Sequence, residues 1–141
     1  MKDIIIIGVG RFGLILAKEL FEKGHEILAI DKDKKRVQKA VDYSTYAVQA
    51  DFINEENWGK FEIDKFDVGI VGIGKNLYDN LAATFILNKF NVFYIIAKAK
   101  DKLQGELLKE VGVDEIVYPE RDIGVKVAGE LDDNFAMKLN N

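Results

Sequence analysis

The chain has 141 residues, of which 48% are hydrophobic and 31% are charged, with no cysteine and a formal net charge of −4. This length fits one domain with its own core, and the lack of cysteine excludes disulfides and thiolate zinc sites. The acidic balance argues against nucleic acid as a partner. The apolar runs are too short for a spanning helix or a signal peptide, so we expect a cytoplasmic protein without direct membrane insertion.

Short apolar runs alternate with longer amphipathic segments, which is typical of a parallel sheet wrapped by helices. The predicted strands are Asp3–Val9, His25–Asp31, Tyr46–Ala50, Phe66–Ile73, Val92–Ala97 and Glu115–Tyr118. The predicted helices are Arg11–Lys23, Lys34–Val41, Leu77–Phe90, Lys102–Val111 and, after Pro119, Glu120–Leu131. Because crossovers between parallel strands are right-handed, this succession predicts a Rossmann-like, doubly wound α/β fold of three layers with strand order 3-2-1-4-5-6.

The pattern divides the chain into a domain at 1–131 and a final segment at 132–141. That segment is polar at both ends and carries Phe135, Met137 and Leu139 at alternate positions. Three interpretations stay open: a loosely ordered end, a linker toward something further, or a strand that pairs with another chain.

A G-x-G-x-x-G motif joins the first predicted strand to the first helix, and its residues are Gly8, Val9, Gly10, Arg11, Phe12 and Gly13. In dinucleotide-binding folds the first glycine permits a tight turn, the second admits a pyrophosphate, and the third packs the helix on the strand. The helix N-terminus presents free N–H groups to the phosphates. Asp31 ends the second strand 18 residues after Gly13, where an acid binds ribose hydroxyls. Together these features predict a dinucleotide or adenosine site.

The carboxylate of Asp31 favours NAD or an adenine nucleotide over NADP, because it repels a 2′-phosphate. Three nearby cations, Lys32, Lys35 and Arg36, weaken that preference. They either neutralise a 2′-phosphate or form the solvated basic face of a short helix.

The ends of the third and fourth predicted strands supply the other walls of the site. Asp51 and Phe52 are expected beside the adenine, where Asp51 accepts from the exocyclic amine or caps the following turn. Ile73, Gly74 and Asn76 follow the fourth strand across the switch point, where such sheets bind ligands. The alternative for this second glycine-rich stretch is a flexible turn.

No constellation of catalytic residues accompanies the site. His25, the single histidine, is predicted at the opposite end of the sheet, and Ser44 has no histidine to activate it. A hydride-transferring enzyme builds its substrate pocket largely from a second domain, whereas the predicted sheet takes up the whole chain. We therefore expect a protein that is not an enzyme.

Several segments follow the order and spacing of one known family. They are G-V-G-R-F-G at 8–13, G-H-E-I-L-A-I-D at 24–31, V-G-I-G-K-N at 71–76, A-K-A-K at 97–100 and L-K-E-V-G-V-D-E-I-V-Y-P-E-R-D-I-G-V-K at 108–126. With them the chain resembles the N-terminal nucleotide-binding (TrkA-N) domain of the regulators of potassium conductance. That family includes the cytosolic KtrA-like subunits of Trk and Ktr potassium-uptake systems. The last segment is the most specific, because general Rossmann dehydrogenases do not share it.

The resemblance implies a cytosolic regulatory subunit that binds ATP/ADP or NAD(H) and gates a potassium-translocating membrane subunit at the inner face of the membrane. It also implies a homo-oligomer, from a dimer up to an octameric ring. By position, Arg11 senses a terminal phosphate, Lys98 adds charge near the phosphates, and Glu120 reaches a nucleotide held by a neighbouring subunit. The final helix, with Ile123 and Leu131, forms a subunit contact, packs on its own core, or does both.

Two other functions stay open at this point. One is an NAD-dependent oxidoreductase, or a cofactor-binding fragment of one, and the other is a module that regulates a different transporter such as an antiporter. Family members of this kind usually continue into a C-terminal ligand-binding domain. The segment at 132–141 is accordingly interpreted as a tail or linker toward such a domain.

Overall fold

Six parallel strands form one sheet in the order β3-β2-β1-β4-β5-β6, which confirms the predicted Rossmann-like topology. The computed structural model describes residues 1–141. The strands are β1 (Asp3–Ile7), β2 (Glu26–Asp31), β3 (Tyr46–Gln49), β4 (Val68–Val71), β5 (Tyr94–Lys98) and β6 (Glu115–Val117). All five pairings between neighbouring strands are parallel, so the carboxyl ends of the strands share one edge of the sheet.

Five α-helices connect or follow these strands. They are α1 (Arg11–Glu22), α2 (Lys34–Ala40), α3 (Leu77–Lys89), α4 (Lys102–Glu110) and α5 (Pro119–Leu139). The side chains of Asp33, Asn76 and Asp101 accept hydrogen bonds from first-turn backbone N–H groups and so cap α2, α3 and α4. Pro119 occupies the first turn of α5, where its missing N–H costs no helical hydrogen bond.

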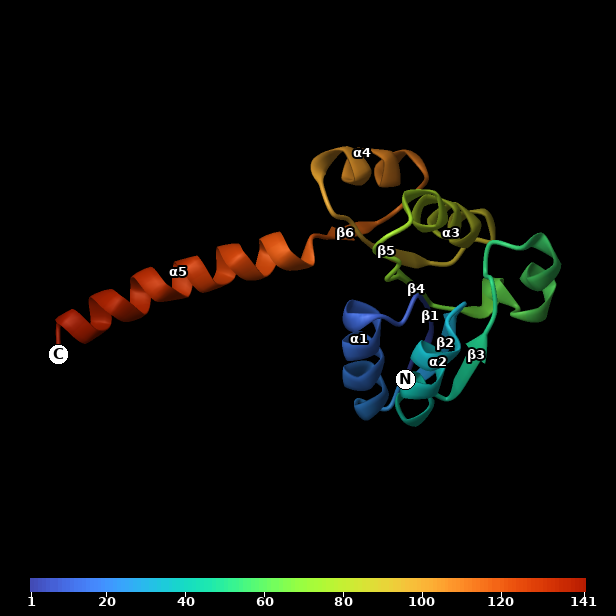
Figure 1. Cartoon of the computed structure of the whole chain (residues 1–141), viewed down its shortest axis with the longest axis horizontal. Helices are drawn as coiled ribbons and strands as arrows, with labels where there is room; N and C mark the ends of the chain where they lie inside the picture. The colour runs from blue at the N-terminus through green and yellow to red at the C-terminus, as the bar shows by residue number, and fades with distance from the viewer.

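Helices cover both faces of the sheet, with α1 and α2 on one side and α3 and α4 on the other (Figure 1). The side chains of β1 alternate between two cores accordingly. Ile4 and Ile6 belong to the cluster under α1 and α2, and Ile5 and Ile7 belong to the cluster that includes Leu87 of α3. Because both faces are covered, the central strands are apolar at nearly every position.

Strands β1 and β4 each end two residues earlier than predicted, whereas β2 ends at Asp31 as predicted and β5 extends one residue further, to Lys98. Gly8 has a φ of 90°, a left-handed conformation that glycine adopts readily, and this turn ends β1 at Ile7. Gly72 and Ile73 likewise lie beyond the last residue of β4, Val71. The residues released from the two strands form the loops at the carboxyl edge of the sheet.

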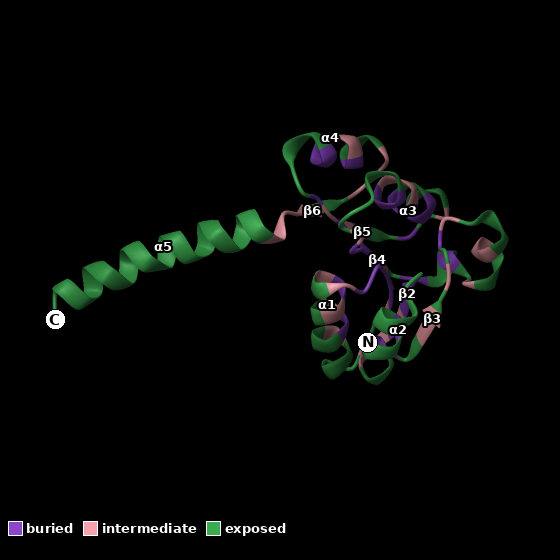
Figure 2. Ribbon diagram, viewed as in Figure 1, coloured by how far each residue is buried: buried purple, intermediate pink, exposed green.

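Helix α5 continues to Leu139, although we expected it to end at Leu131 with an irregular or strand-like segment after it. That expectation was wrong. Apolar side chains recur at every fourth residue and form one winding stripe, which is a helical rather than a strand pattern: Ile123, Val127, Leu131, Phe135 and Leu139. No residue of α5 is buried and the helix projects away from the sheet, so it does not pack on its own core (Figure 2).

None of the helices, α5 included, has the length and apolar character needed to cross a membrane.

Candidate functional site

A pocket of about 290 Å³ lies at the carboxyl ends of β1 to β5, where the sequence placed the ligand crevice. Most of the predicted site residues line it: Gly8, Gly10, Arg11, Asp31, Lys32, Arg36, Asp51, Phe52, Ile73, Gly74, Asn76 and Lys98. Residues that are distant in the sequence therefore come together at one edge of the sheet. What each of them binds stays a prediction at this stage.

The glycines of the first loop have two different physical roles. A Cβ atom on Gly13 would collide with the backbone carbonyl of Gly8, and one on Gly8 would lie 2.9 Å from the backbone nitrogen of Ile73. Both glycines are thus required by close backbone packing. Gly10 differs, because a Cβ there would meet only the Arg36 guanidinium, at 3.7 Å or more. Packing within the chain does not explain Gly10, whereas the approach of a ligand to the backbone does.

The N-terminus of α1 opens into this pocket without a side-chain cap. Gly10 is its N-cap residue, and the first turn holds no acidic side chain. The first N–H groups of a helix have no intrahelical acceptor, and the helix dipole makes this end positive. The end of α1 that faces the pocket is therefore suited to an anion.

Asp31 is held in a fixed orientation beside the glycine loop. One carboxylate oxygen accepts from the backbone N–H of Val9 and the other accepts from the N–H of Asp33, both at 2.9 Å. The Arg36 guanidinium lies 3.9 Å from the same carboxylate, and the residue is 8% exposed. Asp31 thereby joins the end of β2 to the loop that follows β1 while keeping acceptor capacity toward the pocket.

The opposite wall is held together by Asn80, which sequence reasoning missed. Its buried side-chain amide donates to the carbonyl oxygens of Ile73 and Lys98, each at 3.0 Å. These carbonyls stand at the ends of β4 and β5, so one side chain fixes two loops. The available sequence signal was a polar residue next to apolar positions of the predicted helix, just after the second glycine-rich stretch. A polar side chain that becomes buried there needs hydrogen-bond partners.

A salt bridge that the sequence did not predict spans the two walls. Lys32, at the end of β2, donates to Asp79, in the first turn of α3, at 2.8 Å. The side chain of Lys32 is 58% exposed and that of Asp79 only 11%. The hydrogen bond and the charge of Asp79 raise the pKa of Lys32 above its ordinary value of 10.5, although partial desolvation opposes the shift.

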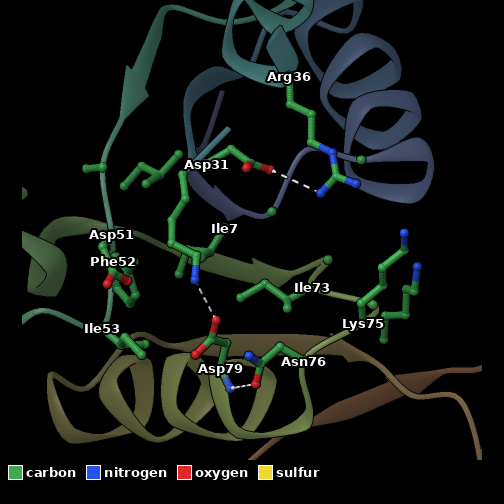
Figure 3. Close-up of a pocket in the computed structure, with 18 of the residues that line it drawn as sticks. Ile7, Asp31, Arg36, Asp51, Phe52, Ile53, Ile73, Lys75, Asn76 and Asp79 are labelled. Carbon is green, nitrogen blue, oxygen red and sulfur yellow. Dashed lines mark hydrogen bonds and ion pairs between the residues drawn. The ribbon is translucent and has the colours of Figure 1, made fainter. Parts of the chain in front are cut away.

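The charges of the pocket are arranged in two groups. Arg11, Lys75 and Lys98 line it and have no acidic side chain within salt-bridge distance. The acidic residues Asp51 and Asp79 lie away from Lys75, with Asp31 on the wall opposite Asp79 (Figure 3). The pocket thus holds three cations that have no ion-pair partner, while Lys32 is paired with Asp79 and Arg36 with Asp31 and Asp33.

Four predicted site residues do not line the pocket. Val9, Phe12 and Gly13 belong to the loop and the start of α1, and Val9 contributes its N–H to Asp31. Glu120 lies in the first turn of α5, outside the pocket of its own chain. A role for Glu120 at a nucleotide would therefore require a second copy of the chain.

The doubly wound sheet, with a glycine-rich turn at its switch point, defines a Rossmann-type domain. The family model described as the TrkA-N domain matches residues 4–119. The chain belongs to this family, as its motifs indicated.

Several relatives have names, and among them are two potassium-uptake proteins of the Ktr system. The chain is 33% identical over 139 residues to the Ktr system potassium uptake protein A of Vibrio alginolyticus, a match that covers 99% of the chain and 63% of the relative. It is 36% identical over 132 residues to the Ktr system potassium uptake protein A of Bacillus subtilis, covering 94% and 60%. The chain therefore spans about three fifths of the length of these relatives.

Solved structures share the fold. The TrkA-N domain of the Escherichia coli inner membrane protein ybaL superimposes with a TM-score of 0.81 at 22% identity, covering 92% of this chain and 96% of that one. The GsuK channel bound to NAD gives a TM-score of 0.73 at 17% identity, covering 87% of this chain and 22% of the channel.

Proposed function

We propose that this chain is the nucleotide-sensing, non-enzymatic domain of a cytosolic regulatory subunit in a potassium-uptake system. It binds ATP/ADP or NAD(H), and the bound nucleotide changes the conformation of an assembly that gates a potassium-translocating membrane subunit. Membership of the TrkA-N family and the potassium-uptake names of two relatives support the partner. The chemistry of the pocket supports a nucleotide as the ligand.

The observation that carries the proposal is the combination of Gly10 with the uncapped α1. Gly10 has no packing reason to lack a side chain, and the helix behind it presents unpaired N–H groups to the pocket. A phosphate at this position is stabilised by those N–H groups and by the helix dipole. None of α2, α3 and α4 combines an uncapped N-terminus with a position in this pocket, because each is capped by an Asp or Asn side chain.

The distribution of charges in the pocket favours one orientation of the bound nucleotide. Its phosphates lie at the glycine loop toward Arg11 and Lys98, its ribose hydroxyls donate to Asp31, and its base lies beside Asp51 and Phe52. Ile73, Gly74 and Asn76 form the facing wall. A terminal phosphate adds negative charge on the side with free cations, so a guanidinium there binds a third phosphate more strongly than a second. Such a differential contact is what a two-state assembly needs to respond to its ligand.

Helix α5 provides the surface for assembly. Its exposed apolar stripe has no partner within the chain, and burying such a surface drives association. We propose a homo-oligomer, with a dimer as its unit and an octameric ring as the full assembly. In this arrangement Glu120 reaches the nucleotide of a neighbouring subunit, and the ring sits at the inner face of the membrane.

Calorimetric titration of the purified chain with ATP, ADP and NAD, together with light scattering of each complex, tests the proposal. We expect saturable binding and an assembly size that depends on the nucleotide. NAD(H) binding with turnover of a small carbonyl compound would instead establish an oxidoreductase. The absence of binding by all three nucleotides would overturn the nucleotide site itself.

Arg11→Ala tests the sensing role. We expect the dissociation constant for ATP to rise about tenfold and that for ADP to rise much less, because a charge-assisted hydrogen bond to the terminal phosphate is lost. Lys18→Ala removes a cation from the same helix outside the pocket and should change neither constant. Equal losses for ATP and ADP would contradict a role for Arg11 in reading the terminal phosphate.

A further inference from the structure

The salt bridge between Lys32 and Asp79 lies next to Asp31, at the end of β2. In nucleotide sites of this fold, the residues at this position distinguish NAD from NADP. Lys32 directly follows Asp31, the residue proposed to bind the ribose. A cation near that acid is what accommodates the 2′-phosphate of NADP in related folds. The sequence alone left this role open for Lys32 and Arg36.

The salt bridge with Asp79 holds the Lys32 ammonium away from the ribose position. The Lys32 ammonium lies 2.8 Å from the Asp79 carboxylate, which comes from a helix 47 residues further along the chain and on the facing wall. The carboxylates of Asp51 and Asp31 add to the negative surroundings of the ammonium. Lys32 is thus stretched across the pocket and is not available at the ribose.

Asp79 in turn depends on Lys32. Its side chain is almost covered, and Lys32 is the only cation within salt-bridge distance of it. Moving Lys32 onto a ligand phosphate would leave a nearly buried carboxylate without its counter-ion, which is costly. The pair therefore resists separation more than an exposed surface pair would.

The other candidate cation is also occupied. Arg36 lies 3.9 Å from Asp31 and 3.9 Å from Asp33. Lys35 does not line the pocket. The ribose side of the pocket consequently holds carboxylates and paired cations, whereas the three unpaired cations stand on the phosphate side.

We propose that Asp79 is a specificity-determining residue of the nucleotide site: by holding Lys32 across the pocket, it prevents this lysine from binding a 2′-phosphate. The ligand class is thereby narrowed to adenine nucleotides with a free 2′-hydroxyl. Asp79 acts through Lys32, so it is a positioning residue. This inference rests on the proposed nucleotide function.

The test compares two ligand pairs, NAD with NADP and AMP with adenosine 2′,5′-bisphosphate, whose members differ only by a 2′-phosphate. Calorimetry at constant ionic strength gives the affinity ratio within each pair for the wild type and for Asp79→Asn. In Asp79→Asn we expect the affinity for NADP relative to NAD, and for adenosine 2′,5′-bisphosphate relative to AMP, to rise about tenfold. This is the lower end of the effect of one charge-assisted hydrogen bond. Far-UV circular dichroism verifies that the variant is folded.

Two further variants isolate the cause. The double variant Lys32→Met with Asp79→Asn should lose the gain, because no lysine is left to bind the 2′-phosphate. Glu62→Gln removes one negative charge at a distant ion pair with Lys65 and should leave the ratios unchanged.

The outcomes separate this inference from the proposed function. If the wild type binds nucleotides but Asp79→Asn leaves both ratios unchanged, the specificity role is overturned alone. The same holds if the gain persists in the double variant, since charge removal rather than Lys32 would then explain it. If the wild type binds none of these nucleotides, the proposed function is overturned together with the inference.

Discussion

The body of the protein, residues 1–118, and helix α5 place their apolar side chains in opposite ways. Every buried hydrophobic residue belongs to the body, and all of them except Val37 lie in two cores on the faces of the sheet. The apolar stripe of α5 is exposed along its whole length, and Leu131 in its middle is 64% exposed. The body thus has its stabilising contacts within the chain, while the contacts of α5 with the body lie at its first turn, where Arg121 stacks 3.9 Å above the Tyr118 ring and Asp122 accepts from the Tyr118 N–H. An isolated helix of this kind is marginal in water without tertiary packing.

The charged groups show the same contrast. In the body, Lys32 and Asp79 join two elements from opposite walls of a pocket. In α5 the ion pairs are local, between Arg121 and Asp122 and between Lys126 and Glu130. Exposed local pairs contribute about 0–1 kcal/mol each and fix no tertiary arrangement. The body is therefore expected to fold by itself, and α5 is expected to be stabilised by a second chain.

The largest expected effect comes from removing a core side chain of the body. Leu87→Ala should lower the free energy of unfolding by about 2–5 kcal/mol, because Leu87 is fully buried and a cavity would remain. Leu131→Ala makes the same chemical change on α5 and should alter the stability of the dilute protein by less than about 0.5 kcal/mol. Urea unfolding of both variants measures the difference. Equal losses would show that α5 packs on the body.

A smaller effect is expected for assembly. Leu131→Glu places a charge in the apolar stripe and should weaken self-association at least about tenfold, because that charge would have to be desolvated. Lys126→Gln changes the net charge equally but lies off the stripe by the helical period, so it should have little effect. Analytical ultracentrifugation of both variants supplies the dissociation constants. A similar response of the two would exclude the stripe as the contact surface.

The smallest effect concerns alkaline pH. The pKa of Lys32 in the folded body is raised above 10.5 by its hydrogen bond to Asp79. The salt bridge therefore contributes fully to the free energy of unfolding below the pKa of Lys32 in the unfolded chain, and this contribution is lost as the pH rises through the raised pKa of the folded state. Lys32 is largely solvated but Asp79 is nearly covered, so we expect a loss of about 1 kcal/mol or less, the upper end for surface pairs. Urea midpoints on either side of pH 10.5 should fall more for the wild type than for Asp79→Asn, and a larger fall in the variant would contradict this origin.

The sequence predicted most of the body for clear physical reasons. Continuous apolar runs identify strands that are covered on both faces, and right-handed crossovers leave one natural strand order. The motif from Gly8 to Gly13 and the position of Asp31 could be predicted because the turn and the strand end constrain them locally. Residues whose place depends on their own short segment were thus accessible.

Features that depend on two distant segments were not accessible. Asp79 and Lys32 are separated by 47 positions, and no local sequence pattern relates the two residues. Asn80 was missed for the same reason, since its two acceptors lie at the ends of different strands. The end of α5 was misjudged because alternate apolar positions from Phe135 to Leu139 obscured the four-residue period that runs through them.

The length of α5 has a mechanical consequence. At a rise of 1.5 Å per residue, its 21 residues make a rod of about 31 Å, and its first turn contacts the body through Arg121 and Asp122 at Tyr118. A rotation of about 10° at this attachment would move the far end near Leu139 by about 5 Å, by the geometry of a helical rod. Asn80 ties the end of β5 to the end of β4, so Lys98 and the Gly74 loop form one unit beside the pocket. The rod would convert small displacements near that pocket into large ones at its tip.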